Sequence, residues 1–255
     1  MNKIFVNGED ERSIFLKEML QKEGKYTNLE NAEYVYFSIP FRKYNNLEEI
    51  KNLNKKIIIG GASKEQKEFL DNNNVEYIDL MKNEKFVYNN AVLTAESTIP
   101  FILSTKKSSI QNLNILVMGY GRIGSNLSEI LNKLGANLFC FARRKESIAK
   151  IIKLGYNYIE LESIANNLEK IDIIINTIPR NILSYEMLSK IKEYHIPVLE
   201  LASSPYGMDI SIADKLEVDY KILSALPARI VPKSAALFVK ETIYEEIMKG
   251  REKWT

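Results

Sequence analysis

The feature that most constrains this chain is the stretch NILVMGYGRIGSNLSEILNKLGANLFCFARRKES at residues 114–147. An apolar run of strand length precedes three glycines, an amphipathic segment of helical period follows them, and a second apolar run comes next. Glycines at positions 119, 121 and 124 have the spacing G-x-G-x-x-G. Between a strand and a helix, this spacing is typical of a loop that binds a dinucleotide. A plain structural turn is the alternative.

Each glycine in such a loop has a separate mechanical role. The first permits the tight turn, the second lets the backbone approach a pyrophosphate, and the third lets helix and strand pack closely. The N–H groups at the start of the helix then point at the phosphates. We therefore expect cofactor contacts from the whole loop: Gly119, Tyr120, Gly121, Arg122, Ile123 and Gly124.

The end of the second apolar run indicates which dinucleotide is bound. Arg143 lies 19 residues after Gly124, where a carboxylate would accept hydrogen bonds from the adenosine ribose of NAD. Ala142 is followed there by Arg143, Arg144 and Lys145, and a guanidinium can hold a 2′-phosphate through two hydrogen bonds. The sequence therefore predicts NADP(H) bound at Ala142, Arg143 and Arg144, with NAD less favoured. The alternative is a solvated charge cluster at the start of the next helix.

Strand-like and helix-like segments alternate along most of the chain, which predicts an α/β fold with mainly parallel sheets. We predict a C-terminal doubly wound Rossmann domain and a smaller N-terminal α/β domain of the flavodoxin-like type. The predicted limits are 1–92 for the N-terminal domain, 93–110 for a connecting helix interrupted by Pro100, and 111–231 for the Rossmann domain. A C-terminal helix at 232–255 is expected to pack back on the N-terminal domain.

Ligands in an open α/β sheet bind at the carboxyl ends of the strands. The apolar run at 171–179 ends in Asn176, Thr177, Ile178 and Pro179, and the run at 197–205 ends in Ala202 and Ser203. We expect the first five of these residues to contact the cofactor and Ser203 to contact the substrate. Strand termination by turn-forming residues is the alternative.

Composition excludes several classes of function. The 255 residues carry a formal net charge of +2, which gives no electrostatic reason to expect binding to nucleic acid or to an anionic membrane. We find no apolar run approaching the roughly 18 residues of a membrane span, and the N-terminus is too charged for a signal peptide. A single cysteine and a single histidine predict a cytoplasmic protein without a Cys/His metal site.

An ordered set of motifs resembles one family. The run NNAVLTAESTIPFILSTKKSSIQNLNILVMGYGRIG from Asn90 is followed by GANLFCFARR, IDIIINTIP, LELASSPYGMD and ALPARIVPKSAA. Over residues 90–245 this set resembles the A subunits of bacterial dipicolinate synthase, and the opening VNGEDER is loosely similar as well. The single motifs are shared with other dehydrogenases, whereas their ordered combination is more specific.

The resemblance implies a sporulation enzyme in the cytoplasm of the mother cell. It implies an NADP-dependent oxidation of a dihydrodipicolinate-type precursor from the lysine pathway to pyridine-2,6-dicarboxylate, together with a flavoprotein-like B subunit. A dicarboxylate substrate requires cations, for which Arg180 and Arg229 are candidates. Lys233 or Glu96 could accept the proton. His195 is a poor candidate, because it precedes a predicted strand and so lies at the far end of the sheet.

Two motifs depart from the family pattern, which leaves other functions open. Ser204 and Tyr206 stand where the family has an arginine followed by Pro-Gly-Gly, and Ala225 and Ala228 replace glycines of a Gly-Leu-Pro-Gly motif. One alternative is another NADP-dependent dehydrogenase of a small carboxylate, and a second is a cofactor-binding subunit without chemistry. A homo-oligomer is also left open, although an apolar stripe like that of the last helix is typical of a core face.

Overall fold

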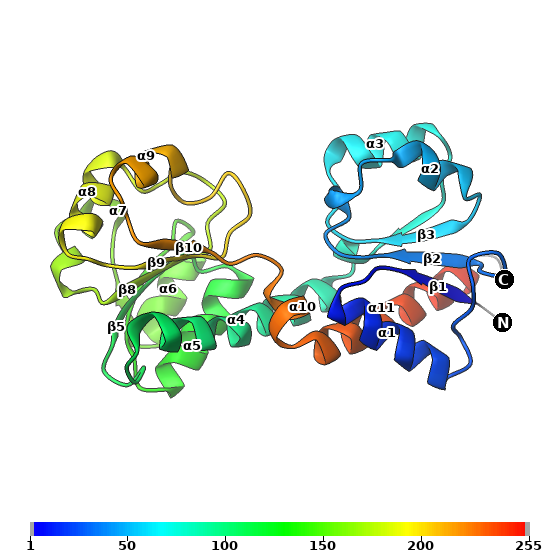
Figure 1. Cartoon of the computed structure of the whole chain (residues 1–255). Coiled ribbons are helices and arrows are strands. Elements are labelled where there is room, and N and C mark those ends of the chain that lie inside the picture. Colours follow the sequence, from blue (N-terminus) through cyan, green and yellow to red (C-terminus); the bar gives the residue numbers. More distant parts are fainter. Residues whose placement is uncertain (1–2, 253–255) are drawn as a thin grey trace. The chain divides into compact units, whose positions relative to one another are not determined.

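The computed structural model describes residues 3–252 and contains two compact α/β units (Figure 1). Within the described range, unit 1 consists of residues 3–93 and 225–252, and unit 2 consists of residues 94–224. Each unit is built on its own parallel sheet, which confirms the predicted fold class. The predicted domain limits stay a prediction.

Unit 2 is built on a six-stranded sheet. Its strands are β5 (Asn114–Met118), β6 (Asn137–Phe141), β7 (Asn157–Tyr158), β8 (Ile173–Asn176), β9 (Val198–Glu200) and β10 (Tyr220–Ile222). Their order is β10-β9-β8-β5-β6-β7, and all neighbouring pairs are parallel. This is the doubly wound order, in which the winding reverses between β5 and β8. A ligand site is therefore expected at the carboxyl ends of these two central strands.

Helices cover both faces of this sheet. They are α4 (Glu84–Lys106), α5 (Arg122–Lys133), α6 (Lys145–Lys153), α7 (Leu161–Ile164), α8 (Tyr185–Glu193) and α9 (Ile210–Lys215), with the short 3-10 helix η3 (Leu168–Lys170). Figure 1 shows α5 and α6 on one face and α7, α8 and α9 on the other. The core under α8 joins Leu116 and Ile174 of the strands to Leu188 and Ile191 of the helix, all fully buried. Burial of this apolar surface holds the sheet and helices together.

Helix α4 differs from the prediction. It begins at Glu84 and continues through Pro100 to Lys106, whereas the sequence indicated a helix interrupted at the proline. Proline removes the hydrogen bond to the carbonyl four residues earlier, here that of Glu96. Both Glu96 and Pro100 are exposed, so this side of the helix faces water and solvent can satisfy the carbonyl oxygen.

Unit 1 has a four-stranded parallel sheet. The strands β1 (Ile4–Asn7), β2 (Tyr34–Phe37), β3 (Lys56–Ile59) and β4 (Tyr77–Asp79) follow each other in order. A parallel bridge between Ile4 and Tyr26 extends the sheet beyond β1. The chain therefore first moves outward past β1 and then crosses back to β2, as in flavodoxin-like sheets.

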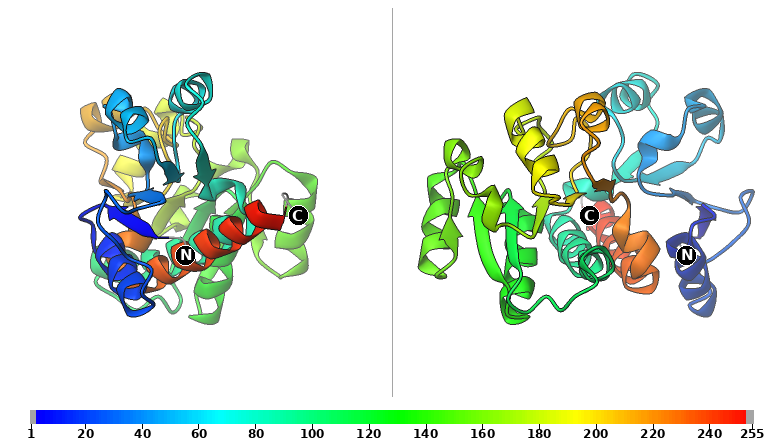
Figure 2. Two further views of the ribbon diagram at one scale, coloured as in Figure 1. Left: turned by 90° about the vertical axis from the view of Figure 1, so that its right-hand side faces the viewer. Right: turned by 60° about the vertical axis from the view of Figure 1, so that its left-hand side comes forward.

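The helices of unit 1 form two layers. They are α1 (Glu11–Lys22), α2 (Leu47–Asn52), α3 (Lys64–Asn72), α10 (Leu226–Ile230) and α11 (Pro232–Glu252), with the 3-10 helices η1 (Phe41–Lys43) and η2 (Leu80–Lys82). Figures 1 and 2 show α1 and α11 side by side, and buried residues of both pack on one face of the sheet. The helices α2 and α3 cover the other face. A capping box of Ser63 and Gln66 starts α3.

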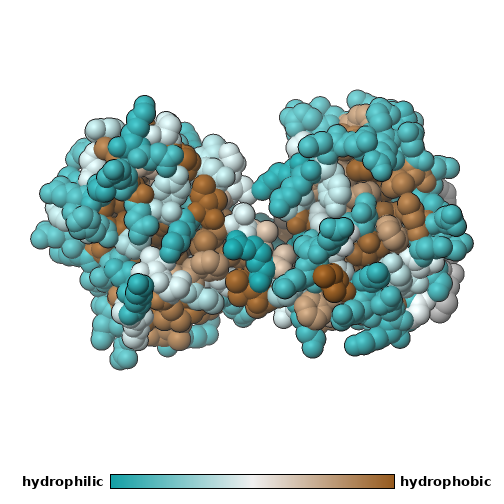
Figure 3. All heavy atoms as spheres, in the orientation of Figure 1, coloured by the Kyte–Doolittle hydropathy of each residue, from teal (hydrophilic) through white to brown (hydrophobic). Residues whose placement is uncertain are grey.

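The C-terminal segment belongs to unit 1. The apolar stripe of α11 lies in the core with α1, and its buried members are Ala236, Val239, Ile243 and Ile247. The segment before it forms α10, which has a proline in its first turn. Among the described helices none is long and apolar enough to cross a membrane. In Figure 3, hydrophilic residues are spread over the visible face of each unit.

Candidate functional site

The loop between β5 and α5 has the geometry that its glycines predict. Gly119 has a φ of +98°, a conformation that favours glycine, and a Cβ there would lie 2.4 Å from Thr177 Oγ1. A Cβ at Gly124 would lie 2.0 Å from the carbonyl oxygen of Gly119. Neither position has room for a side chain, so helix and loop approach as closely as a dinucleotide-binding loop requires.

Gly121 differs from these two glycines, because a Cβ added there would meet nothing within 4 Å. It is the N-cap of α5, and it offers no side chain to cap the helix. The first turn of α5 also contains no acidic residue. Open space, first-turn N–H groups and the positive end of the helix dipole therefore coincide here, which is the arrangement that binds a phosphate.

The arginine pair lies beside this loop. Ala142 is buried after β6, Arg143 and Arg144 are exposed, and Arg144 is the N-cap of α6. The hydroxyl of Ser147 in the first turn of α6 donates to the carbonyl oxygen of Tyr120, at 3.4 Å. This contact ties the arginine-bearing segment to the glycine loop. Tyr120 itself is largely buried, and burial raises its pKa to about 12, so its phenol stays neutral.

The end of β8 completes the floor of the site. Thr177 donates its backbone N–H and its hydroxyl to the carbonyl oxygen of Met118, at 2.8 and 3.0 Å. Ile178 is half-buried and Pro179 is exposed. Asn176 is fully buried, and its amide nitrogen donates to Glu200 and to the carbonyl oxygen of Ile178. Its side chain is thus engaged inside the protein, and its predicted contact with the cofactor stays a prediction.

A buried carboxylate holds the next strand end. Glu200, the last residue of β9, is fully buried and accepts hydrogen bonds from Asn176 and from the backbone N–H groups of Ala202 and Gly207. Burial raises the pKa of Glu200 above its usual 4.5, and the hydrogen bonds partly offset that effect. Ala202 is half-buried and Ser203 is exposed.

The other predicted residues are distributed over both units. Arg180 and Ser203 are exposed in unit 2, and Glu96 is exposed on the part of α4 that belongs to unit 2. Arg229 in α10 and Lys233 at the start of α11 are exposed in unit 1. Their predicted roles stay predictions. Within residues 3–252, no group of three or more His, Cys, Asp or Glu side chains is placed to hold a metal ion.

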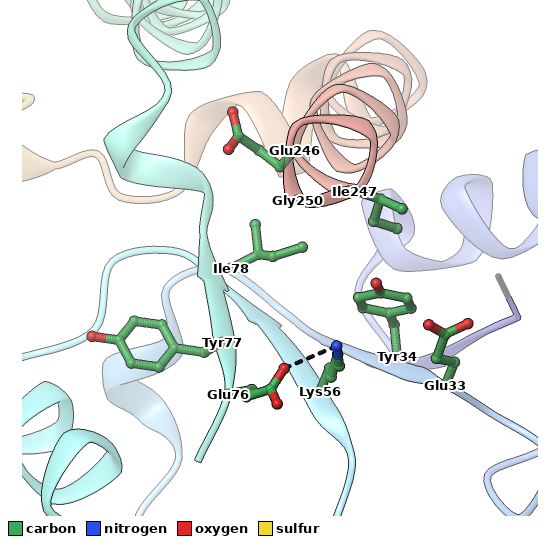
Figure 4. Close-up of a pocket in the computed structure, with 9 residues that line it drawn as sticks. All are labelled: Glu33, Tyr34, Lys56, Glu76, Tyr77, Ile78, Glu246, Ile247 and Gly250. Carbon is green, nitrogen blue, oxygen red and sulfur yellow. Dashed lines mark ion pairs between the residues drawn. The ribbon is translucent and has the colours of Figure 1, made fainter. Parts of the chain in front are cut away.

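A hollow of about 610 Å³ in unit 1 has none of these residues in its lining (Figure 4). Tyr34, Lys56 and Tyr77 stand at the starts of their strands, and the end of α11 closes the other side. Lys56 forms an ion pair with Glu76 at 2.9 Å, and that hydrogen bond raises the lysine pKa. Because ligands of such sheets bind at the carboxyl ends of strands, this opposite end is a poor cofactor site.

Sequence reasoning missed Ser147 and Glu200. A serine in the first turn of a helix is common and gave no signal. For Glu200 the signal was present: a single acidic residue stands among apolar neighbours in the run PVLELA. Charged residues are almost never fully buried without partners, so an acid inside a buried strand indicates a local set of hydrogen-bond donors.

Fold and glycine loop together define a class of protein. Residues 100–198 match the NAD-binding domain of D-isomer specific 2-hydroxyacid dehydrogenases. Unit 2 therefore has the fold of an NAD(P)-dependent oxidoreductase domain, and a nicotinamide dinucleotide is the cofactor that this domain supports. D-lactate dehydrogenase from Escherichia coli has a similar fold, with a TM-score of 0.68, 13% identity and coverage of 98% of this chain and 97% of that one.

Within this class the chain is similar to one particular protein. It is 30% identical over 158 residues to the A subunit of dipicolinate synthase from Bacillus subtilis strain 168, which confirms the resemblance found in the motifs. The aligned region covers 62% of this chain and 53% of that relative. The structure of the corresponding A subunit from Bacillus halodurans has a TM-score of 0.82 and 20% identity, with coverage of 96% of this chain and 97% of that one.

Proposed function

We propose that this chain is an NADP-dependent oxidoreductase that acts as the A subunit of a dipicolinate synthase. It would oxidise a dihydrodipicolinate-type precursor to pyridine-2,6-dicarboxylate. The observation that carries this proposal is the 30% identity to the A subunit of the Bacillus subtilis enzyme over 158 residues. The proposed partner is a flavoprotein-like B subunit. The precursor would come from the lysine pathway, and the enzyme would act in the mother cell of a sporulating bacterium.

The cofactor would lie across the carboxyl ends of the central strands of unit 2. The glycine loop from Gly119 to Gly124 would hold the pyrophosphate, since Gly121 leaves open space at the start of α5. Ala142, Arg143 and Arg144 would surround the adenosine ribose, and the two exposed guanidinium groups favour NADP over NAD. Residues 177–179 and Ala202 would support the nicotinamide end.

Oxidation of the dihydropyridine ring removes the equivalent of one hydride and one proton. Bound NADP⁺ supplies the hydride acceptor. The chain must provide cations for the two carboxylates and an acceptor for the proton. Arg180, Arg229 and Ser203 remain our candidates for substrate contact, and Lys233 or Glu96 for proton acceptance. All five side chains are exposed in their own units, so a ligand can reach each of them.

The proposal is tested by supplying the enzymatically generated precursor with NADP⁺ and measuring dipicolinate and NADPH formed, with and without a flavoprotein B subunit. We expect equal amounts of both products. Gly121→Ala serves as a folded variant with impaired cofactor binding, and Lys233→Met and Glu96→Gln test the two candidate bases. A wild-type chain that binds NADPH yet forms no dipicolinate with or without the partner would refute the proposed reaction.

Another NADP-dependent dehydrogenase of a small carboxylate is the second candidate, favoured by Ser204, Ala225 and Ala228, which depart from the dipicolinate synthase motifs. A panel of 2-hydroxy and 2-oxo acids separates it from the first, because only this candidate predicts turnover of a member of the panel.

A non-catalytic cofactor-binding subunit is the third candidate. Any single-turnover hydride transfer from a bound substrate excludes it.

A further inference from the structure

Glu200 is a titratable group buried inside the cofactor-binding unit to which the proposed reaction gives no role. It ends β9, next to the switch point of the sheet, and its side chain is fully buried. A carboxylate in an apolar interior is costly unless donors surround it. Its neighbours along the chain, Leu199 and Leu201, are buried apolar residues.

The hydrogen bonds of Glu200 explain what the carboxylate does. Oε1 accepts from Asn176 Nδ2 and from the N–H of Ala202, both at 2.8 Å. Oε2 accepts from Asn176 Nδ2 and from the N–H of Gly207, both at 2.9 Å. One side chain thus fastens both ends of the loop that connects β9 to α9, and fastens it to the end of β8.

Where this loop returns, its backbone packs closely against the side chain of Asn176. A Cβ at Gly207 would lie 2.4 Å from Asn176 Nδ2, so glycine is required where the loop returns. The carbonyl oxygen of Gly207 accepts from the N–H groups of Ile182 and Leu183, which lie in the segment after β8. Asn176 Oδ1 accepts from the N–H of Ile178, at 3.2 Å. The two strand ends that would support the nicotinamide therefore share one hydrogen-bond network around Glu200.

A carboxyl group that accepts at both oxygens fits the geometry of this network. Three donors converge on one point, and an ionised carboxylate is a side chain that accepts hydrogen bonds at two oxygens and donates none. A glutamine would turn an NH₂ group toward at least one of these donors. The carboxylate contacts Asn176, Ala202 and Gly207, none of which is charged, so it acts through geometry and not through an ion pair.

We propose that Glu200 is a positioning residue that sets the β9–α9 loop, and through it Ala202 and Ser203, for the nicotinamide end of the cofactor. This inference rests on the proposed cofactor function. It predicts that Glu200 controls binding of one half of the dinucleotide. The adenosine half, which would be held by the glycine loop and the arginine pair, does not depend on it.

The test compares two probes on purified full-length chain. NADPH reports on the whole site, and adenosine 2′,5′-bisphosphate reports on the adenosine half alone. In Glu200→Gln we expect NADPH to bind about 10- to 100-fold more weakly, because the β9–α9 loop is displaced. The affinity for the bisphosphate should stay within about twofold of wild type. The emission shift of the bound nicotinamide should also be lost at saturating NADPH. Glu200→Asp, which keeps both acceptor oxygens, should restore part of the affinity.

Ser128→Ala is the matched control. Ser128 is also fully buried in unit 2, and its hydroxyl lies 3.7 Å from the sulfur of Cys140, apart from the β9–α9 loop. Its loss should lower the unfolding temperature without separating the two probes. If Glu200→Gln lowers the affinity for both probes equally, or for neither, the positioning role is wrong. Binding of both probes by the wild-type chain would still support the cofactor site in that case. A wild-type chain that binds no probe overturns the cofactor function and this inference with it.

Discussion

Substituting alanine for Gly121 separates cofactor binding from stability more sharply than other changes in the glycine loop. The backbone of Gly121 is extended, with φ −85° and ψ −161°, and its added Cβ meets no atom within 4 Å. Any residue adopts this conformation, and a compatible Gly→Ala change stabilises a protein by about 0.4–1 kcal/mol. We therefore expect Gly121→Ala to unfold at the same temperature as wild type or slightly higher.

Cofactor affinity should change in the opposite direction. If the pyrophosphate approaches the backbone at Gly121, the new methyl group occupies its space, and an overpacked contact costs about 1–3 kcal/mol. At a factor of ten for each 1.4 kcal/mol, NADPH should bind about 5- to 150-fold more weakly. Isothermal titration gives the affinity, and thermal unfolding gives the stability.

Two further glycine variants complete this experiment. Gly124→Ala places a Cβ 2.0 Å from the carbonyl oxygen of Gly119, so it should lose both affinity and about 1–3 kcal/mol of stability. Gly250→Ala in α11 meets nothing within 4 Å and lies in unit 1, so it should leave NADPH affinity unchanged. If Gly121→Ala binds NADPH as tightly as wild type, the phosphate does not approach this backbone and the reasoning is wrong.

Three other predictions concern charges. The hydrogen bond from Lys240 is the main cause that lowers the pKa of Glu23, so Glu23→Gln should lower the free energy of unfolding by about 0.2–1 kcal/mol at neutral pH. Urea unfolding should show this difference shrinking as pH falls from 4.5 through the folded-state pKa of Glu23. Lys67→Met removes the 2.6 Å ion pair of the buried Asp79 and should lower the free energy of unfolding by about 3 kcal/mol. Adding Asp79→Asn to this variant should restore part of the lost stability, because the uncompensated charge is removed. Burial raises the pKa of Glu200, so its ionisation costs more in the folded chain than in the unfolded one. Stability should therefore fall as pH rises from 4.5 through the folded-state pKa, and Glu200→Gln should lack this slope.

The sequence was sufficient for the features that depend on local pattern. The spacing of the glycines predicted the loop because Gly119 and Gly124 have no room for a side chain, as the close approach of Gly124 to the carbonyl oxygen of Gly119 shows. Alternation of apolar runs predicted both parallel sheets for a similar reason, since strands buried on two faces are apolar throughout. These requirements are local, so no knowledge of distant contacts was needed.

Other features depended on contacts between distant residues. Pro100 was expected to interrupt α4, yet exposure of that side of the helix removes most of the penalty. The sequence also contained no indication that the amide of Asn176 bonds to Glu200, a residue 24 positions away. Propensity and spacing contain no information on such partners, because the partners are decided by how the strand ends meet in the folded sheet.

The most direct test of the account is a titration of the purified chain with NADPH and with NADH, repeated with Arg143→Ala. We predict that the wild-type chain binds NADPH more tightly than NADH. In Arg143→Ala this preference should disappear while NADH affinity stays the same, because Arg143 would contact only the 2′-phosphate. Equal affinity for both cofactors in the wild-type chain would contradict the role given to the arginine pair. Binding of neither would contradict the assignment of the glycine loop as a dinucleotide site.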